Sequence, residues 1–481
     1  MYAGILAHWY TGTLAHLAPI TPIQKYYFED RSASAACKLS RSAAKDNRIR
    51  GLPSAEGTSS LARRGAHGKW EKNAERDLFT YASRYMRLGD LQPYWVEAPC
   101  RFGKNGKSVA RYWPIFLPHE VAHHIYETNE SEFHRRFGSD NPDRVREYWQ
   151  RMEDEPWFVA HPLKHRIQRD PHKYLPMRIH GDDCQYSKKS QVLILNMSPV
   201  LVQLQTIISR LLLLCFPMIY MLDQMTFECI YEAIVWSFNL LSDEGKFSGL
   251  DHLGQPHTDA NRARRAGETL LGGFFLALVQ ICGDWKWIKE TLQVASYHAG
   301  NFCYKCFATK ALGPLNAWHF DDDAGWILAP RSNETFMRHL DDLNIAFSKL
   351  VGMHIDLIMA DLLHICMLGF FFFLNGSVLW ELCWEGSYFG TAGGAWKQRA
   401  TIMLKRAFQH FNDFCKQNQL VSSHPSFTCA GLRMSSLQSN PMLTAKGSSS
   451  LQIARWLATI TRHDALASPM DEHKQFLAAS L

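Results

Sequence analysis

The chain has little cysteine, little excess charge and no recognisable export signal. Its 12 cysteines among 481 residues are scattered, which excludes the dense, regularly spaced disulfide framework of small secreted proteins. The formal net charge of +6 is too small for composition alone to indicate nucleic-acid binding. Residues 1–23 lack the basic start and continuous apolar stretch of a signal peptide. We therefore expect an intracellular protein with reduced cysteines.

Apolar runs long enough to cross a membrane are also scarce. Residues 211–222 are too short, and residues 357–382 are long enough but carry Asp361 and His364 in their first third. Charged groups are costly in the middle of a bilayer. We therefore expect a buried core helix over this run and no membrane partner. An integral membrane protein that uses 357–382 is kept as a further alternative.

Composition divides the chain into four expected parts. Residues 1–70 are rich in Lys, Arg, Ser, Ala and Gly, which predicts a disordered basic leader; a phosphate-contacting arm is the alternative. Residues 71–172 show helical spacing of apolar residues and predict a small helical subdomain. Residues 173–420 are expected to form the core, and the Ser-rich residues 421–481 a weakly structured tail with one helix near 450–461.

The core is expected to be α/β, with strands followed by helices. Three histidines precede its first strand, at positions 161, 165 and 172, and their irregular spacing indicates a solvated linker rather than a metal cluster. The expected strands are 174–179, 192–197 and 211–221, and the expected helices are 226–241, 285–294, 333–350, 355–374 and 396–417.

Acidic residues stand where strands end or helices begin. Asp182 or Asp183 ends the first strand, Asp284 follows an apolar run, and Asp361 precedes His364 by one turn of an apolar helix. A buried acid must be paired, protonated or metal-bound. If the acids converge, they can hold two divalent ions about 3.5–4 Å apart for phosphodiester chemistry. Taken singly, Asp284 is by default an N-cap and the adjacent Asp182 and Asp183 are by default turn residues. Asp361 could be a buried hydrogen-bond acceptor.

A second motif is the pair Cys303 and Cys306. Two thiolates at this spacing can hold one edge of a tetrahedral zinc site. The remaining ligands would come from His298, His319 or another distant residue. The alternatives are structural cysteines at a turn and a redox pair, although the sequence context of thioredoxin-like pairs is missing.

These motifs occur in a particular order along the chain. The strand-ending aspartate is followed by Cys282-Gly-Asp-Trp-Lys-Trp287, by Cys303-x-x-Cys306, and by Asp361-Leu-Leu-His364-x-x-x-Leu-Gly369. In this order the chain resembles the transposases of CACTA-type and related cut-and-paste DNA elements. The resemblance covers residues 177–385, and its specificity rests on the order and spacing of short motifs.

The resemblance implies a fold and a set of catalytic residues. The fold would be ribonuclease H-like: a mixed sheet flanked by helices, with an inserted segment, preceded here by the small helical subdomain. A DDE or DDD triad would bind Mg²⁺ or Mn²⁺, with zinc as a further cofactor at the cysteine pair. The residues carried over are Asp182 or Asp183, Asp284 and Asp361 as the acids, His364 in the Asp-x-x-His motif, and Glu381 or Glu385 as the final glutamate.

The expected function is that of a transposase in the nucleus. Two Mg²⁺ ions would activate water to nick DNA at an element end, and the freed 3′ hydroxyl would attack target DNA. A second copy of the chain is a further candidate partner. Arg262, Arg264, Arg265 and the basic helix 396–416 could contact phosphates, or could simply form a solvated face. The alternative is an inactive or domesticated relative that binds DNA or proteins without cutting.

Overall fold

The computed structural model describes residue 41 and residues 91–479, apart from 103–105, 188–189, 203, 205–208, 297, 320, 385–387 and 469. The basic leader expected over 1–70 lies outside the described residues, except for residue 41. The chain divides into two compact units, Met1–Met359 and Ala360–Leu481. Each unit has a hydrophobic core of its own. The boundaries expected at 173 and 420 do not coincide with this division.

The first unit is built around a mixed sheet of four strands in the order β5-β4-β3-β6. The first three strands along the chain are antiparallel neighbours, and the last runs parallel to β3. A single parallel bridge joins Ile281 of β6 to Ile358. The strands are β3 (Tyr174–Ser187), β4 (Ser190–Pro199), β5 (Leu211–Pro217) and β6 (Phe275–Gly283). The three predicted strands are confirmed. The fourth strand, β6, is an almost uninterrupted apolar run, as expected for a strand covered on both faces.

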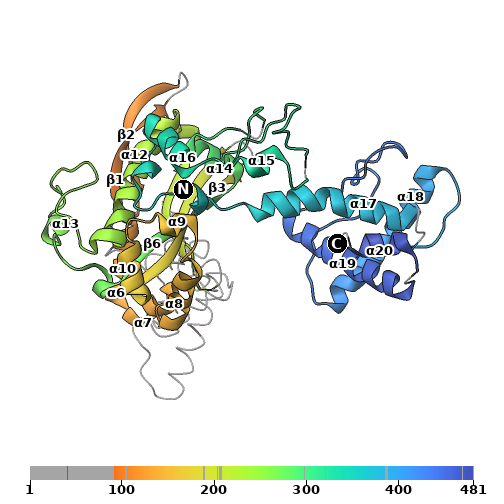
Figure 1. Cartoon of the computed structure of the whole chain (residues 1–481), viewed down its shortest axis with the longest axis horizontal. Helices are drawn as coiled ribbons and strands as arrows, with labels where there is room; N and C mark the ends of the chain where they lie inside the picture. The colour runs from red at the N-terminus through yellow and green to blue at the C-terminus, as the bar shows by residue number, and fades with distance from the viewer. Residues whose placement is uncertain are drawn as a thin grey trace, which may run out of the picture. The chain divides into compact units, whose positions relative to one another are not determined.

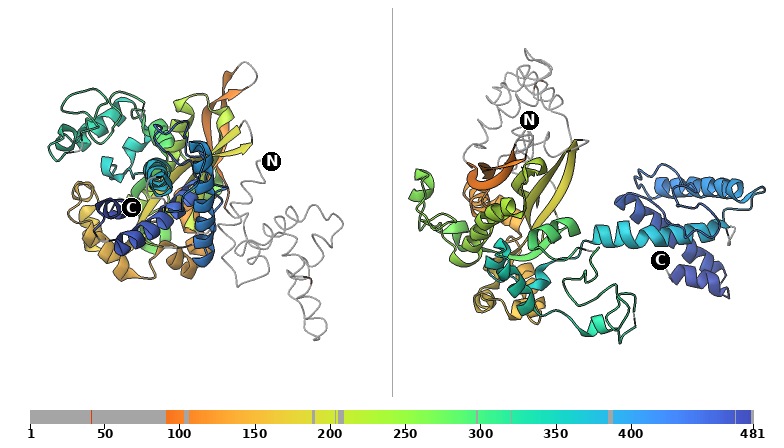
Figure 2. Two further views of the ribbon diagram at one scale, coloured as in Figure 1. Left: turned by 90° about the vertical axis from the view of Figure 1, so that its right-hand side faces the viewer. Right: turned by 90° about the horizontal axis from the view of Figure 1, so that it is seen from above.

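Helices flank this sheet, which confirms the expected mixed α/β class (Figures 1 and 2). The helix predicted over 226–241 is α12 (Gln224–Asn239), which begins where the Asp223 carboxylate accepts a hydrogen bond from the Met225 amide at 2.9 Å. It contacts α14 and β6. The further helical segments of this unit after β3 are η4 (Met218–Tyr220), η5 (Leu240–Glu244), α13 (Ala260–Arg264), η6 (Leu270–Gly273), α14 (Trp285–Leu292), α15 (Gly325–Leu328), α16 (Asn333–Asp342), η7 (Ala346–Lys349) and η8 (Ile355–Leu357).

The helical subdomain expected over 71–172 is only partly correct. Its described part begins with an antiparallel hairpin, because Tyr94–Phe102 alternates buried and exposed residues as a strand does. Its helices pack into the same hydrophobic core as the sheet rather than into a core of their own. The elements are β1 (Tyr94–Phe102), β2 (Lys107–Ile115), α6 (Pro118–Thr128), α7 (Glu130–Phe137), α8 (Pro142–Arg151), α9 (Pro156–Val159), α10 (Lys164–Arg169) and η3 (Pro171–Lys173).

Three histidines are buried in this part of the first unit: His119, His123 and His161. His119 Nδ1 lies 2.7 Å from the Ser237 hydroxyl, and its ring packs edge-on against Trp236 and Phe247. His161 is also buried, with Nδ1 accepting from the Leu163 amide at 3.1 Å. The solvated linker expected around His161 is therefore wrong, because its ring is enclosed by the core. Burial lowers the pKa of His119 to about 3 and that of His161 to about 4.

The lowered pKa values of His119 and His161 predict that the chain loses stability in acid. Their pKa values in the folded chain lie below the 6.5 of the unfolded chain, so the unfolded chain binds more protons as the pH falls. The free energy of unfolding should be highest above about pH 6.5 and should decrease as the pH falls towards 3. At pH 5 each histidine should cost about 2 kcal/mol relative to pH 8. Urea unfolding at pH 5 and pH 8 measures the difference in unfolding free energy. In the variant His161→Gln this difference should be smaller by the contribution of His161. An unchanged decline in that variant would contradict the assignment.

The second unit is helical. The weakly structured tail expected over 421–481 is only partly correct: the helix expected near 450–461 is confirmed and residues 421–446 form no helix or strand, but the tail contributes to a hydrophobic core. Trp456 is fully buried and packs against Phe411, Phe427 and Phe389, with ring centroids 5.4, 5.7 and 5.9 Å away. The sequence did not indicate this core, because its aromatic residues are widely spaced along a Ser-rich segment. The elements are η9 (Leu363–Phe370), α17 (Phe371–Trp384), α18 (Trp396–Gln417), α19 (Gly447–Ala467) and α20 (Glu472–Ala479).

The apolar run at the start of this unit is far less buried than the core helix that we expected. Leu362, Ile365, Phe370 and Phe373 are each more than half exposed. Among the described residues one helix, Leu363–Trp384, is long and apolar enough to cross a membrane, and only 28% of its most apolar window is buried. Length and composition alone support that possibility, which the core helices of soluble proteins share.

Candidate metal centre

Two glycines and a tryptophan bring the motif Cys282-Gly-Asp-Trp-Lys-Trp287 against the first predicted acid. Gly181 of β3 lies opposite Gly283 of β6. A Cβ atom at Gly181 would lie 2.0 Å from Trp287, and one at Gly283 would lie 2.3 Å from the same ring. The indole therefore lies directly over both strands, and its Nε1 donates to the Tyr231 hydroxyl at 3.2 Å. This contact fixes α14 against the sheet and α12.

The carboxylates of Asp183 and Asp284 are placed at this junction. Asp284 caps α14, and its Oδ1 accepts from the Trp287 amide at 2.7 Å. Asp183 shares the strand face of Gly181, since side chains alternate along a strand, and its side chain is only 11% exposed. Lys286, in the first turn of α14, forms an ion pair with Asp183. Asp284 therefore has the capping role foreseen for it, beside a second acid.

A third carboxylate, Glu290, belongs to the same group, which sequence reasoning missed. Burial raises the pKa of Glu290, and the charges of Asp183 and Asp284 raise it further, although Lys286 opposes them. The pKa of Lys286 is lowered by burial, but the contact with Asp183 outweighs this and the net shift is upward. The i, i+4 spacing of Lys286 and Glu290 on one helix was the available signal.

The neighbouring Asp182 faces the other way. Its side chain alternates with that of Asp183 along β3 and is exposed. The charge of Asp182 acts on Cys184, whose thiol pKa is raised first by burial and then by this carboxylate. It also acts on Arg210, whose pKa is lowered mainly by burial. Of the two adjacent acids, Asp183 is the one that pairs with Lys286 and whose charge acts on Glu290 of α14.

Asp361 and His364 belong to the second unit, where they form a pair. Asp361 stands before the helix rather than inside it, and its carboxylate accepts from the Leu363 amide at 2.9 Å and contacts His364 Nδ1 at 2.5 Å. Our expectation of a buried acid within an apolar helix is wrong, because this segment is exposed. Glu381 pairs with His473 at 3.1 Å, and Glu385 lies outside the described residues.

The expected zinc ligands are not brought into one group in the described part of the chain. Cys303 and Cys306 lie at a turn where Arg331 donates to the Cys306 carbonyl at 3.2 Å. Burial raises the Cys306 thiol pKa, and Cys303 adds to this. His298 is exposed. A cavity of about 340 Å³ lies beside Cys303 and is also lined by His339, a residue that the sequence did not single out.

His319 instead lies with two aspartates. Its Nε2 is 3.2 Å from Asp321 and 3.4 Å from Asp323. The ligand atoms of these three side chains lie within 4.8 Å of one another, so the group could hold a metal ion. Both aspartates are largely exposed, and this loop is separate in sequence from the acids at the sheet.

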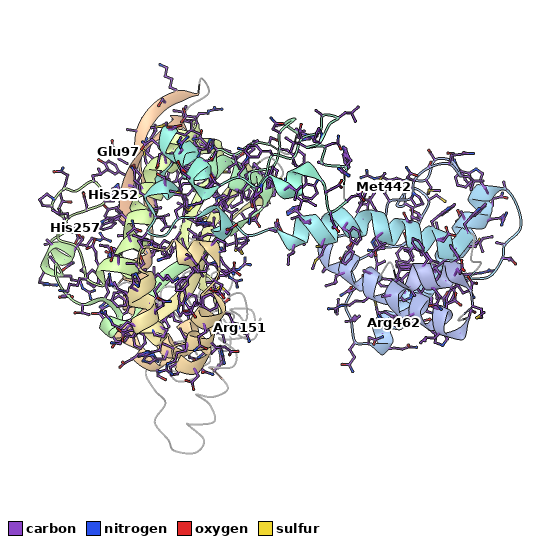
Figure 3. All side chains as sticks on the ribbon, in the orientation of Figure 1. Glu97, Arg151, His252, His257, Met442 and Arg462 are labelled. Carbon is purple, nitrogen blue, oxygen red and sulfur yellow. The ribbon has the colours of Figure 1, made fainter. Side chains whose placement is uncertain are left out.

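The arginines considered for phosphate contact are already paired within the first unit. Arg262 donates to both oxygens of Glu120, at 2.6 and 2.9 Å, and is 15% exposed. Arg265 pairs with Glu127 at 2.7 Å and stacks on a phenylalanine ring. Arg264 is exposed. Nearby, His252 (labelled with His257 in Figure 3) lies 2.7 Å from the Tyr94 hydroxyl. This surface is therefore largely self-neutralised.

Comparison with known proteins does not assign the chain to a family. No protein family, no curated protein and no solved structure matches the chain. The assignment of a function consequently depends on the geometry described above.

Proposed function

We propose that the chain is a transposase-like protein that cuts and joins DNA at the carboxylates between β3 and α14. The observation that carries this proposal is that the charges of Asp183 on β3 and of Asp284 and Glu290 at α14 act on Lys286, although the strand and the helix come from two distant places in the sequence. Neighbouring carboxylates repel one another unless a cation neutralises part of their charge. A lysine ammonium already stands against one of them, so the site attracts positive charge.

The sheet topology supports the finer assignment to a ribonuclease H-like fold. Three antiparallel strands are followed by a helix and then by a strand parallel to the first. The first acid stands on the first of these strands and the second directly follows the fourth. That is the arrangement implied by the resemblance to CACTA-type transposases. The residues between β6 and the bridge at Ile358 would be the inserted segment.

The chemical type of these side chains suits a divalent cation, but not their spacing: among the described residues the ligand atoms that lie within 4.8 Å of one another in a group of three are those of His319, Asp321 and Asp323. A shared metal would require the carboxylates at the sheet to move closer together. Carboxylate oxygens held on a strand and at a helix start are hard donors of the kind that Mg²⁺ and Mn²⁺ prefer. Asp183, Asp284 and Glu290 would hold the metal, and a bound divalent ion supplies an activated water and charge stabilisation at a phosphodiester. A zinc ion would be bound by Cys303 and Cys306, whose thiol groups supply two ligands. The DNA partner and a nuclear location follow from the same proposal.

Replacing Asp284 by asparagine should abolish metal binding while keeping the helix cap. Asparagine caps helices as well as aspartate does, so the variant removes charge and a ligand without removing the cap. We expect Mn²⁺ affinity, measured by calorimetry on the full chain, to fall by more than about 100-fold, beyond the loss typical of outer-shell changes. Mn²⁺-dependent nicking of a DNA duplex should be lost with it.

The matched control is Asp223→Asn, which changes the cap of α12 in the same way. It should bind Mn²⁺ and nick DNA as the unchanged chain does. The variant Glu290→Gln tests a further acid of the first unit and should weaken Mn²⁺ binding. Retention of Mn²⁺ binding in Asp284→Asn, or no Mn²⁺ binding by the unchanged chain, would refute the metal-dependent function.

The second candidate is a catalytically inactive, domesticated relative that binds DNA or proteins. One observation favours it: Lys286 already neutralises Asp183, which is what a decayed metal site with an internal counter-ion would show. DNA retention without Mn²⁺ binding and without nicking, in the same measurements, would identify this candidate.

A further inference from the structure

The helical segment that opens the second unit is apolar, yet none of it is buried. Residues 362–374, in η9 and the start of α17, are all exposed or half-buried. His364 is their only strongly polar side chain, and it is paired with Asp361. The following residues of the same helix, 375–383, lie mostly in the core of the second unit. A continuous exposed apolar surface of this kind marks an interaction site in a folded protein.

Four side chains of this segment form one row along the helix. They recur at positions i, i+3, i+8 and i+11, which share one side of a helix. A Cβ atom at Gly447 of α19 would lie 2.4 Å from Leu363 and 3.8 Å from Met367, so another side of the segment packs on α19 (Figure 1). The members of this apolar row, each between 53% and 65% exposed, are Leu362, Ile365, Phe370 and Phe373.

The exposed part of the helix is too short to cross a bilayer. Residues 362–374 are at most about 20 Å long at 1.5 Å per residue, whereas the hydrocarbon core of a bilayer is about 30 Å thick. The next turn is held in the protein, because the Asn375 side-chain amide donates to the Ser450 carbonyl at 2.9 Å and Leu379 is fully buried. A helix with one free apolar side can instead lie in the plane of a membrane surface, with that side at the acyl boundary.

Two exposed cations stand beside the apolar row. Arg433 Cζ lies 4.8 Å from the centroid of the Phe372 ring, and Lys446 directly precedes α19 at the end that meets Leu363. Neither cation has an ion pair with a carboxylate among the residues that the structure describes. Residues 360–481 carry ten Lys and Arg against seven Asp and Glu, so the second unit as a whole is positive. This charge complements anionic lipid headgroups.

We propose that the apolar row is a membrane-binding surface, which lies in the plane of an anionic bilayer with Arg433 and Lys446 at the level of the lipid phosphates. A second copy of the chain fits the row less well. A two-fold interface places the same patch of both chains face to face, so it would bring these unpaired cations towards those of the other copy. The inference goes beyond the proposed function and does not depend on it, because none of these residues belongs to the acids of the first unit.

The test is co-sedimentation of the full chain with vesicles of phosphatidylcholine and phosphatidylserine. The double variant Ile365→Ser with Phe370→Ser should lower the affinity for these vesicles about tenfold or more, because two half-exposed apolar side chains no longer enter the acyl boundary. The matched control is Leu466→Ser with Phe476→Ser, which removes the same kinds of side chain at positions that are 76% and 68% exposed in the same unit. It should bind the vesicles as the unchanged chain does.

A second variant tests the electrostatic part without altering the helix. Lys446→Gln should weaken binding to the phosphatidylserine vesicles about fivefold, the effect of one basic residue near an anionic surface. Binding to vesicles of phosphatidylcholine alone should not change. The control Lys416→Gln removes the same charge from α18, where the side chain is 79% exposed and already paired with Asp413, and should leave both affinities unchanged.

Three results would overturn the inference. The first is that the unchanged chain does not sediment with anionic vesicles, and the second is that the double variant of the apolar row and its control bind equally well. The third is that the unchanged chain associates with itself in vesicle-free sedimentation velocity and that Ile365→Ser with Phe370→Ser abolishes this, which would assign the row to a second copy. The proposed function is judged separately, by Mn²⁺ binding and nicking, and none of these results bears on it.

Discussion

Replacement of Gly181 by alanine should destabilise the first unit severely. The added Cβ would lie 2.0 Å from the Trp287 ring, which is buried and hydrogen-bonded to Tyr231. Inside a strand, alanine is ordinarily the better residue by roughly 0.5–1 kcal/mol, so the expected sign is the opposite of the usual one. We expect a loss of at least about 3 kcal/mol, at the upper end for overpacked cores, measured by urea unfolding.

The matched control is Gly300→Ala, because a Cβ at Gly300 would meet no atom within 4 Å. It should change the stability by less than about 1 kcal/mol. Trimming the clashing ring in the double variant Gly181→Ala with Trp287→Leu should recover part of the loss, so that the two changes are not additive. Additive losses would mean that Trp287 does not lie over Gly181.

Replacement of Glu132 by glutamine should be the next most damaging change. Glu132 Oε1 accepts from Arg136 Nε at 2.7 Å, and the two side chains are 10% and 3% exposed. Burial raises the pKa of Glu132, but hydrogen bonds from Arg135 and Arg136 outweigh this, and the net shift is downward. Removing the carboxylate charge leaves the Arg136 charge buried without its counter-ion. We expect a loss of about 3–5 kcal/mol in unfolding free energy.

An exposed pair on the next helix provides the comparison. Glu147 and Arg151 also lie 2.6 Å apart, but their side chains are 57% and 71% exposed. The variant Glu147→Gln should cost no more than about 1 kcal/mol, because solvent screens exposed pairs. Adding Arg136→Met to Glu132→Gln should restore stability, since the uncompensated charge is then gone. Equal losses in Glu132→Gln and Glu147→Gln would show that burial does not set the strength of the pair.

The strands and the longest helices of the core could be read from the sequence. The strands at 174–179, 192–197 and 211–221 and the helix at 226–241 have apolar patterns with a clear period, and their bounds in the structure differ by a few residues or more at the ends. Local patterns suffice for such elements because their buried faces are continuous in the chain. The helix near 450–461 was also predicted, but the core into which it packs was missed, since that core depends on Phe411, Phe427 and Trp456, which are far apart in sequence.

The candidate site was predictable only in part. The sequence marked Asp284 and the pair Asp182 and Asp183. The prediction that one of the pair ends the first strand is wrong, because both are paired with β4 and β3 continues to Ser187. The sequence could not choose between the adjacent aspartates, since which face of β3 is covered by α14 is a property of the packing. It also gave no reason to include Glu290, whose carboxylate reaches the group only once Trp287 has fixed α14 on the sheet.

The sequence by itself thus determined the mixed α/β character of the first unit, because the periodicity of apolar residues is a local property. Tertiary structure alone decided that Asp183, rather than Asp182, pairs with Lys286 of α14. It also decided that Asp361 lies at the exposed start of a helix in the second unit. Charges and ring contacts act through space, so residues a hundred positions apart become neighbours only when the strands pair and the helices pack.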